Sequence, residues 1–171
     1  PIHVSRKPVG TLVLDDLRPG RRLWLLATGT GLAPFLAVLR DPETWEHFEQ
    51  VYLVHGVRRV TDLAYRELIE QALPAHEYLG PLLRGRLHYV PVVSREPFPR
   101  AGRITSLLAD GALEASIPAT PLDPAQDRLM LCGGPGMLAD LRTLLDARGF
   151  VASPSQGVPG DYVYERAFVE R

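Results

Sequence analysis

The sequence contains very little cysteine or lysine: Cys132 and Lys7 are the only residues of their kinds among 171. A single cysteine excludes an internal disulfide, an iron–sulfur cluster held by this chain alone, and a zinc site made of cysteines. The net charge of −1 and the pI near 6.6 exclude the strong positive field that attracts nucleic acid or anionic membranes. No apolar run is long enough to cross a bilayer, and no signal peptide is visible. We therefore expect a cytoplasmic protein that binds neither nucleic acid nor membranes.

Short apolar segments, by contrast, recur along the whole chain and alternate with helix-like segments. The apolar segments are residues 23–27, 51–55, 87–93, 129–132 and 161–165. Their nearly continuous apolar character is typical of strands buried on both faces of a parallel sheet. Alternation of such strands with helices predicts an α/β fold, a doubly wound parallel sheet of five strands. In such folds the ligand lies beyond the carboxyl ends of the strands, where the strand order reverses.

Helix signals lie between these strands. Pro34 suits the first turn of a helix that continues to about Arg40. A second helix is predicted over residues 62–73, with Asp62 as its cap. A third begins at Pro135 and stops before Gly149. The segment 113–127 is rich in proline and alanine, which favours a loop.

A glycine loop follows the first predicted strand. Thr28, Gly29, Thr30 and Gly31 stand between this strand and the helix, but Pro34 occupies the place of the third glycine in a G-x-G-x-x-G fingerprint. Glycine lets the backbone approach a ligand closely, the hydroxyl groups add donors, and a helix start favours a pyrophosphate group. The alternative is a plain strand-to-helix turn without a ligand.

A second loop of the same kind follows the fourth predicted strand. Cys132, Gly133 and Gly134 lead into a helix that carries Met137 in its first turn. If the first and fourth strands are neighbours in the sheet, both loops face one crevice. For Cys132 alone, the alternative is a small buried residue without a functional role.

Arginine is concentrated where the second and third strands end. The polar residues there are Arg58, Arg59, Ser94, Arg95 and Arg103. In dinucleotide-binding sheets, an acid after the second strand binds the ribose 2′-hydroxyl of NAD, whereas arginine accepts the 2′-phosphate of NADP. The guanidinium group suits bidentate contact with phosphate. The cluster therefore favours NADP(H), although each arginine alone could be a solvated surface side chain.

The C-terminal segment from Tyr162 to Arg171 is apolar and aromatic enough to predict a docked terminus. Glu165 would then lie near the crevice, or else be an edge-strand carboxylate in water. No metal site is expected, because the histidines lack ligand spacing. They are His3, His47, His55, His76 and His88.

Six motifs together resemble one known family, the NADP-binding domain of bacterial ferredoxin–NADP reductases. In chain order they are ATGTGLAPF, VHGVR, VSRE, GRI, LCGGPGM and AFVER. In that family the first loop reads G-T-G-x-A-P, so proline replaces the third glycine. The resemblance implies that residues 1–20, with the strand-like TLVL, are the end of an FAD-binding β-barrel. Residues 21–171 would then be the NADP-binding α/β domain.

The resemblance also implies roles for individual residues. Those implied for the pyrophosphate are Thr28, Gly29, Thr30 and Gly31, and those for the 2′-phosphate are Arg58, Ser94, Arg95 and Arg103. Cys132 and Gly133 would approach the nicotinamide, and Gly134 and Met137 are further cofactor-binding candidates. Glu165 resembles a carboxylate that assists proton transfer, Ala167 would face the flavin ring, and Phe168 would lie over the adenine.

The activity implied is that of an NADPH–ferredoxin or flavodoxin oxidoreductase, acting as a monomer. NADP(H) exchanges hydride with FAD, which passes single electrons to ferredoxin or flavodoxin. The flavin-binding arginine, tyrosine and serine motif of the barrel does not occur in this sequence, so FAD would be held mainly by a domain absent from it. Two alternatives stay open: a stand-alone NADP-binding module, and a reductase component that feeds an oxygenase.

Overall fold

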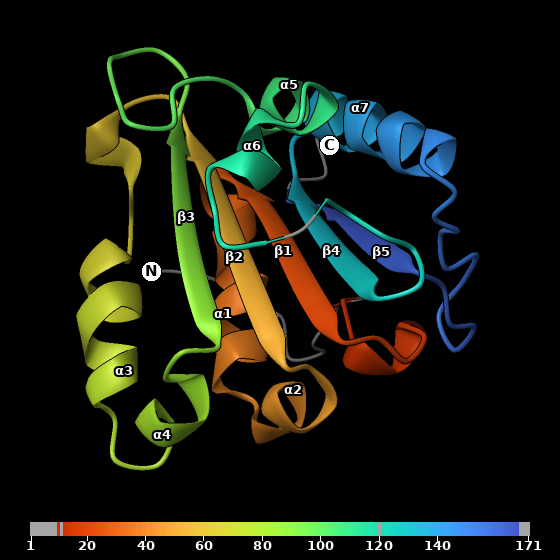
Figure 1. The fold of residues 1–171 in the computed structure, drawn as a ribbon, viewed down its shortest axis with the longest axis horizontal. Helices are drawn as coiled ribbons and strands as arrows, with labels where there is room; N and C mark the ends of the chain where they lie inside the picture. The colour runs from red at the N-terminus through yellow and green to blue at the C-terminus, as the bar shows by residue number, and fades with distance from the viewer. Residues whose placement is uncertain (1–9, 11, 120, 168–171) are drawn as a thin grey trace, which may run out of the picture.

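A computed structural model describes Gly10 and residues 12–119 and 121–167 of the chain. Five parallel strands form one sheet in the order β3-β2-β1-β4-β5 (Figure 1). The strands are β1 (Arg22–Thr28), β2 (Gln50–Val57), β3 (Leu87–Val93), β4 (Asp127–Gly133) and β5 (Tyr162–Arg166). The predicted five-stranded parallel sheet is confirmed; four of the predicted apolar segments lie within strands, and the fifth, 161–165, begins one residue before β5.

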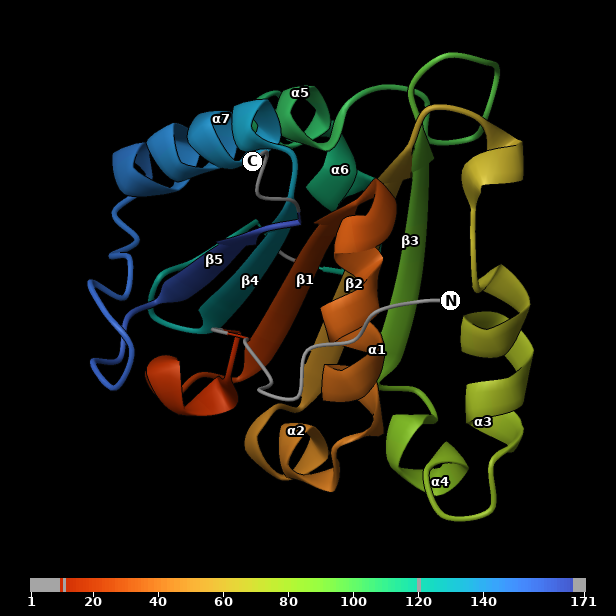
Figure 2. The same cartoon turned by 180° about the vertical axis from the view of Figure 1, so that it is seen from behind.

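Helices cover both faces of the sheet. The helices that precede β3 are α1 (Leu32–Arg40), α2 (Pro42–His47), α3 (Leu73–Ala75) and α4 (Gly80–Leu83); those that follow it are α5 (Ile104–Ala109), α6 (Ala112–Ala115) and α7 (Pro135–Ala147). Figure 1 shows α6 and α7 in front of the sheet, and Figure 2 shows α1 in front when the molecule is turned around. This is the doubly wound arrangement that the sequence predicts.

Alternate residues of the central strand β1 belong to two separate cores. Leu23 and Leu25 pack with Phe35 of α1, whereas Trp24 and Leu26 pack with residues of α5 and α7. Because successive side chains of a strand point to opposite faces, a strand covered on both faces must be apolar throughout. This explains the unbroken apolar runs of the sequence.

The strand order reverses between β1 and β4, which lie side by side in the middle of the sheet. The chain winds outward from β1 through α1 to β2 and β3, then crosses back to β4. The loops after β1 and β4 therefore flank the switch point, where open α/β sheets bind their ligands.

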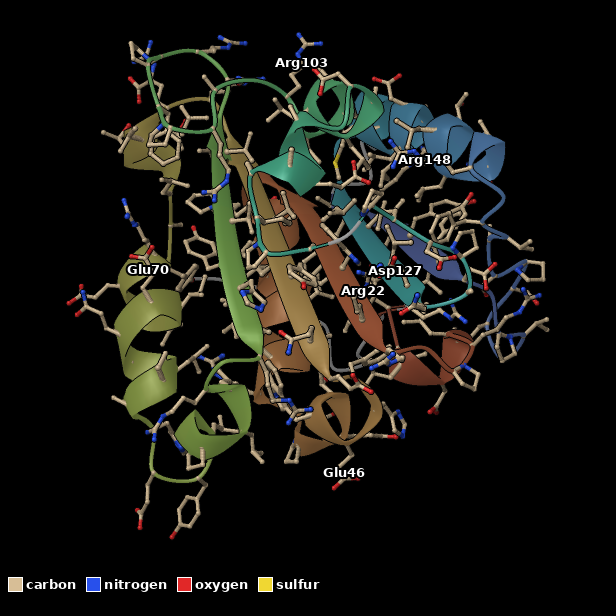
Figure 3. The ribbon with its side chains drawn as sticks, in the orientation of Figure 1. Arg22, Glu46, Glu70, Arg103, Asp127 and Arg148 are labelled. Atoms are coloured by element: carbon tan, nitrogen blue, oxygen red, sulfur yellow. The ribbon has the colours of Figure 1, made fainter. Side chains whose placement is uncertain are left out.

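A buried ion pair joins the amino ends of β1 and β4. Asp127 is fully buried and accepts hydrogen bonds from Arg22 at 2.5 and 2.6 Å and from Trp24 Nε1 at 2.9 Å. The backbone N–H of Asp123 also donates to this carboxylate, at 2.7 Å. Figure 3 shows Arg22 and Asp127 beside one another near the starts of β1 and β4. Removing one partner would leave an uncompensated buried charge, so this edge depends on the pair for its stability.

The helix predicted over residues 62–73 is wrong at its start. Asp62 ends a 3₁₀ turn (Val60–Asp62) and accepts from the backbone N–H of Arg59 at 3.0 Å. Helical structure starts later, at Arg66, and continues as a π-helical turn (Leu68–Ala72) into α3. Leu63 packs instead with Val57 at the end of β2, and Tyr65 has a left-handed backbone with φ 59°. These two features take the chain off a helical path.

Other boundaries also differ from the prediction. Part of the predicted loop 113–127 is helical, since α6 ends at Ala115, and α2, α4 and α5 were not predicted. Within the described part of TLVL, the structure has no strand and instead forms a 3₁₀ turn (Leu14–Asp16). The division of the chain at residue 20 stays a prediction. Among the described helices, none has the length and apolarity needed to cross a bilayer.

Candidate functional site

The two glycine loops touch each other through their backbones. A Cβ on Gly31 would lie 2.1 Å from the carbonyl oxygen of Cys132 and 2.6 Å from its carbonyl carbon. Ala27, the residue before the first loop, is paired with Cys132 in the β1–β4 ladder. Only glycine fits at position 31, and the two loops meet because β1 and β4 are neighbours in the sheet, which was the condition of the prediction.

Thr28 joins the loops through its side chain. Its hydroxyl donates to Met137 Sδ at 3.2 Å and accepts from the N–H of Gly134 at 3.4 Å. A Cβ on Gly133 would lie 2.2 Å from this hydroxyl oxygen, so the side chain lies directly over that glycine. The hydroxyl proton of Thr28 is thus directed at sulfur and not at an open face of the loop, where a phosphate donor would be needed.

The first loop is a single 3₁₀ turn (Gly29–Gly31) that continues into α1. Gly29 has φ +55°, a left-handed conformation that side chains other than glycine rarely adopt. Gly29 and Thr30 are exposed, while Gly31 is buried against the second loop. The positive end of the α1 dipole and the exposed backbone of the turn together suit an anion.

The predicted arginines extend from neighbouring strand ends. The N–H of Ser94 donates to the carbonyl of Val57 at 3.0 Å, and the N–H of Arg95 donates to that of Arg58 at 3.0 Å. The β2–β3 ladder therefore continues past both strands and holds Arg58 next to Arg95. Both side chains are exposed, and neither has a hydrogen bond or ion pair elsewhere in the described ranges.

Arg103 reaches the same edge from a third segment. The N–H of Gly102 donates to the carbonyl of Val93 at 2.8 Å, which fixes the residue after it at the start of α5. Figure 3 shows Arg103 above α5, pointing away from the sheet. It too is exposed and lacks a partner among the residues that the structure describes. Glu96, the acid beside Arg95, accepts instead from the backbone N–H of Val60.

The residues predicted at the nicotinamide end lie side by side. Cys132 is paired with Glu165 in the β4–β5 ladder, and the N–H of Ala167 donates to the carbonyl of Gly133 at 3.1 Å. Cys132 is 3% exposed. Burial, helped by the negative charge of Glu165, raises the pKa of its thiol to about 11, so the group is neutral at pH 7. Phe168 lies outside the described residues.

Sequence reasoning overlooked His55, which it considered only as a metal ligand. The side chain is 1% exposed, and Nδ1 is 3.1 Å from the hydroxyl of Tyr89. Burial lowers the pKa of His55 to about 4, partly offset by the backbone of Gly29 in the first loop. The sequence did contain a signal for this residue: His55 is the one polar residue in the otherwise apolar run 51–55. In the described ranges no cluster of ligating residues could hold a metal ion.

The carboxyl edge of the sheet thus combines two touching glycine loops with three arginines that no acidic side chain of the described residues neutralises. Such an edge can bind an extended molecule with a phosphate at one end and a pyrophosphate in the middle. Cys132, Glu165 and Ala167 border the other end.

Curated relatives share most of this sequence. The chain is 54% identical over 170 residues to a ferredoxin–NADP reductase of Pseudomonas aeruginosa, covering 99% of this chain and 66% of the relative. It is 56% identical over 167 residues to ferredoxin–NADP reductase A of Sorangium cellulosum, covering 98% and 60%. The chain therefore spans somewhat less than two thirds of the length of these relatives.

A solved structure agrees with this similarity. A ferredoxin NADP⁺ reductase of Neisseria gonorrhoeae with bound FAD and NADP matches with a TM-score of 0.80 and 30% identity, over 94% of this chain and 61% of that chain. The resemblance seen in the sequence motifs is confirmed. The family described as oxidoreductase NAD-binding domain matches residues 25–143, and the chain belongs to that family.

Proposed function

We propose that this chain is the NADP(H)-binding part of a reductase that exchanges electrons between NADP(H) and ferredoxin or flavodoxin through FAD. The observation that carries the proposal is the backbone contact between Gly31 and Cys132, because it brings the two glycine loops together at the carboxyl edge of the sheet, the edge that also carries the exposed arginines. The names of the relatives point to the same activity.

The phosphate groups of NADP(H) fit the charges of the site. Arg58, Arg95 and Arg103, with Ser94, would hold the 2′-phosphate. Their exposed guanidinium groups have no acidic partner within the described segments and can make charge-assisted hydrogen bonds. The backbone of Gly29–Gly31 would hold the pyrophosphate at the start of α1. Thr30 is exposed and can add a hydroxyl donor, a role less suited to Thr28.

At the nicotinamide end of the nucleotide, the chain would act mainly by packing against the ring. Cys132, Gly133, Gly134 and Met137 would form the floor on which the ring lies. A neutral buried thiol does not act as a base there, so Cys132 would act by contact alone. Glu165, beside it in the β4–β5 ladder, is the carboxylate that we assign to proton transfer. Phe168 over the adenine stays a prediction.

FAD, when bound, supplies the conversion between hydride transfer and single-electron transfer. The described residues fit it only in part: Ala167, fixed to Gly133 by its backbone hydrogen bond, offers one wall for the ring. Most flavin contacts would come from the barrel domain expected before residue 21. A cytoplasmic location, a monomeric state, and ferredoxin or flavodoxin as partner belong to the same proposal.

A calorimetric titration tests the nucleotide assignment directly. The 171-residue chain should bind NADP⁺ at least roughly tenfold more tightly than NAD⁺, because charge-assisted contacts to the 2′-phosphate are absent from NAD⁺. Equal affinity for the two nucleotides, or no binding of either, would contradict the proposal. A flavin spectrum of a longer chain that includes the barrel would then separate a reductase from a module that only binds NADP(H).

A further inference from the structure

The segments that carry Arg58 and Arg95 are joined where they leave the sheet. Val57 pairs with Val93 at the ends of β2 and β3. Two further backbone hydrogen bonds of 3.0 Å, from the N–H groups of Ser94 and Arg95, extend this ladder as far as Arg58. Figure 1 shows both segments beyond the carboxyl end of β3. The ladder ends with this pair, so the positions of the next residues depend on other contacts.

A side chain continues the connection beyond the ladder. The carboxylate of Glu96 accepts a hydrogen bond from the backbone N–H of Val60, which begins the 3₁₀ turn (Val60–Asp62) after Arg59. The first N–H groups of a helical turn have no acceptor inside the turn, and Glu96 supplies one from the neighbouring segment. Within the described ranges, this is the one hydrogen bond that joins the two segments after Arg95.

The other contacts of the turn do not fix its position as closely. Asp62 accepts from the N–H of Arg59 at 3.0 Å, and its own N–H donates to the Arg59 carbonyl at 3.0 Å, so these bonds are internal to the turn. Leu63 and Phe98 belong to the small core around Val57, but apolar packing is not directional. The bond from Val60 to the Glu96 carboxylate restrains both distance and direction.

The same contact determines where the charge of Glu96 is used. Glu96 is half-buried and follows Arg95 directly in the chain. In the part of the chain that the structure describes, it nevertheless forms no ion pair with Arg58 or Arg95. Its carboxylate is engaged by a backbone N–H group instead, a charge-assisted hydrogen bond. An acid next to the arginines thus restrains their segments without neutralising their positive charge.

We propose that Glu96 is a positioning residue of the 2′-phosphate site: its hydrogen bond to Val60 holds the segment after β2 against the segment after β3, and so keeps Arg58 and Arg95 side by side before the nucleotide arrives. Without this bond, the segment of Arg58 would have to be ordered during binding, which lowers affinity. Glu96 acts through the two arginines and does not touch the nucleotide. The inference rests on the proposed function and concerns only the 2′-phosphate part of the ligand.

Two replacements of Glu96 separate its hydrogen bond from its charge. Glu96→Ala removes both, whereas Glu96→Gln removes the charge but keeps an oxygen that can accept from Val60. In calorimetry of the 171-residue chain, Glu96→Ala should bind NADP⁺ and adenosine 2′-monophosphate roughly fivefold more weakly, the scale of ordering one or two side chains on binding. Its affinity for NAD⁺, which has no 2′-phosphate, should not change.

Glu96→Gln should bind NADP⁺ at least as tightly as the wild-type chain does. Removal of a negative charge near the arginines does not weaken their attraction for a phosphate group, so the weakening expected for Glu96→Ala cannot come from its loss of charge. Binding of NADP⁺ by Glu96→Gln as weak as that by Glu96→Ala would overturn the inference.

Asp110→Ala is the matched control. Its carboxylate also accepts from a backbone N–H group, that of Ala112 at 2.9 Å, but it lies in the turn between α5 and α6. This replacement removes one acid and one hydrogen bond of the same kind, and it should leave the affinities for all three ligands unchanged. Weakening of NADP⁺ by Asp110→Ala as large as that by Glu96→Ala would contradict a specific role of Glu96.

Hydrogen exchange followed by NMR tests the bond itself. The Val60 amide should exchange slowly in the wild-type chain and in Glu96→Gln, and faster in Glu96→Ala; equal exchange in all three would overturn the role. Equal weakening of NADP⁺ and NAD⁺ by Glu96→Ala would show general damage and overturn it too. If the wild-type chain binds neither NADP⁺ nor adenosine 2′-monophosphate, the proposed nucleotide site fails, and the inference with it. Binding of both ligands by the wild-type chain, unchanged in Glu96→Ala, refutes only the positioning role.

Discussion

The Cα of Gly31 faces the peptide carbonyl of Cys132 so closely that the smallest side chain would overlap it, at 2.1 Å from the oxygen. Neither partner can yield easily, because one belongs to the turn before α1 and the other to the buried strand β4. This contact holds together the two loops of the proposed nucleotide site.

Gly31→Ala should therefore lower both stability and nucleotide affinity. Forcing a methyl group against fixed backbone costs about 1–3 kcal/mol of unfolding free energy, measured by urea denaturation, and the displaced loops should lose NADP⁺ binding in calorimetry. Gly136→Ala is the control, since a Cβ at that exposed position in α7 meets nothing within 4 Å. A stable Gly31→Ala chain with normal NADP⁺ affinity would show that the contact is not needed.

Arg95→Ala should separate the two nicotinamide nucleotides. A charge-assisted contact to the 2′-phosphate contributes about 1.5–3 kcal/mol, so binding of NADP⁺ should weaken by roughly tenfold or more while binding of NAD⁺ changes little. Arg84→Ala, which removes an exposed arginine next to α4, controls for the loss of one positive charge. Equal losses for NADP⁺ and NAD⁺ in the titrations would remove Arg95 from the phosphate site.

Cys132 should be unreactive in the folded chain. With a pKa of about 11 against an ordinary value of 9.0, almost no thiolate is present at pH 8, so iodoacetamide should modify the protein only after unfolding. The unfolded chain loses this proton first as the pH rises, so the contribution of Cys132 to stability falls between about pH 9 and 11. Cys132→Ala should lack this alkaline loss. Rapid alkylation of the native protein at pH 8 would contradict the burial of the thiol.

His55 should make the fold sensitive to acid. Its pKa is about 4 in the folded chain and 6.5 as the ordinary value, so the unfolded chain binds the proton first as the pH falls. Stability from this group is complete above about pH 6.5 and decreases toward pH 4, by roughly 3 kcal/mol in all. Urea denaturation at pH 7 and pH 5 measures the effect. His55→Gln should show a smaller difference between the two pH values than the wild-type chain does.

The sheet could be predicted because its signal is local. Strands such as β1 and β4 are buried on both faces, and that burial forces an apolar residue at every position. The glycine loops could be predicted for the same reason, because each stands between an apolar strand and a helix start. The meeting of the two loops was predicted only on the condition that β1 and β4 are neighbours, since that adjacency depends on the path of the whole chain, and the contact between Gly31 and Cys132 was not predicted.

The features that could not be predicted depend on tertiary contacts between segments that are far apart in the sequence. The segment after Asp62 has helical composition, but Leu63 is drawn into a small core with Val57, which delays the helix. The role of Thr28 changed for a similar reason: its hydroxyl meets Met137, which is 109 residues away in the chain. His55 was overlooked because its burial depends on the packing of the whole sheet and its hydrogen-bond partner, Tyr89, comes from another strand.

The two edges of the sheet differ in how their charge is balanced. At the amino edge, Arg22 is neutralised by Asp127 inside the protein, whereas Arg58, Arg95 and Arg103 at the carboxyl edge have no acidic partner among the described residues. A polyanion that binds there should supply the countercharge for these side chains and so stabilise the folded domain. Binding of the polyanion would then raise the melting temperature of the domain. The increase should be largest at low ionic strength, because dissolved salt screens the arginine charges less there.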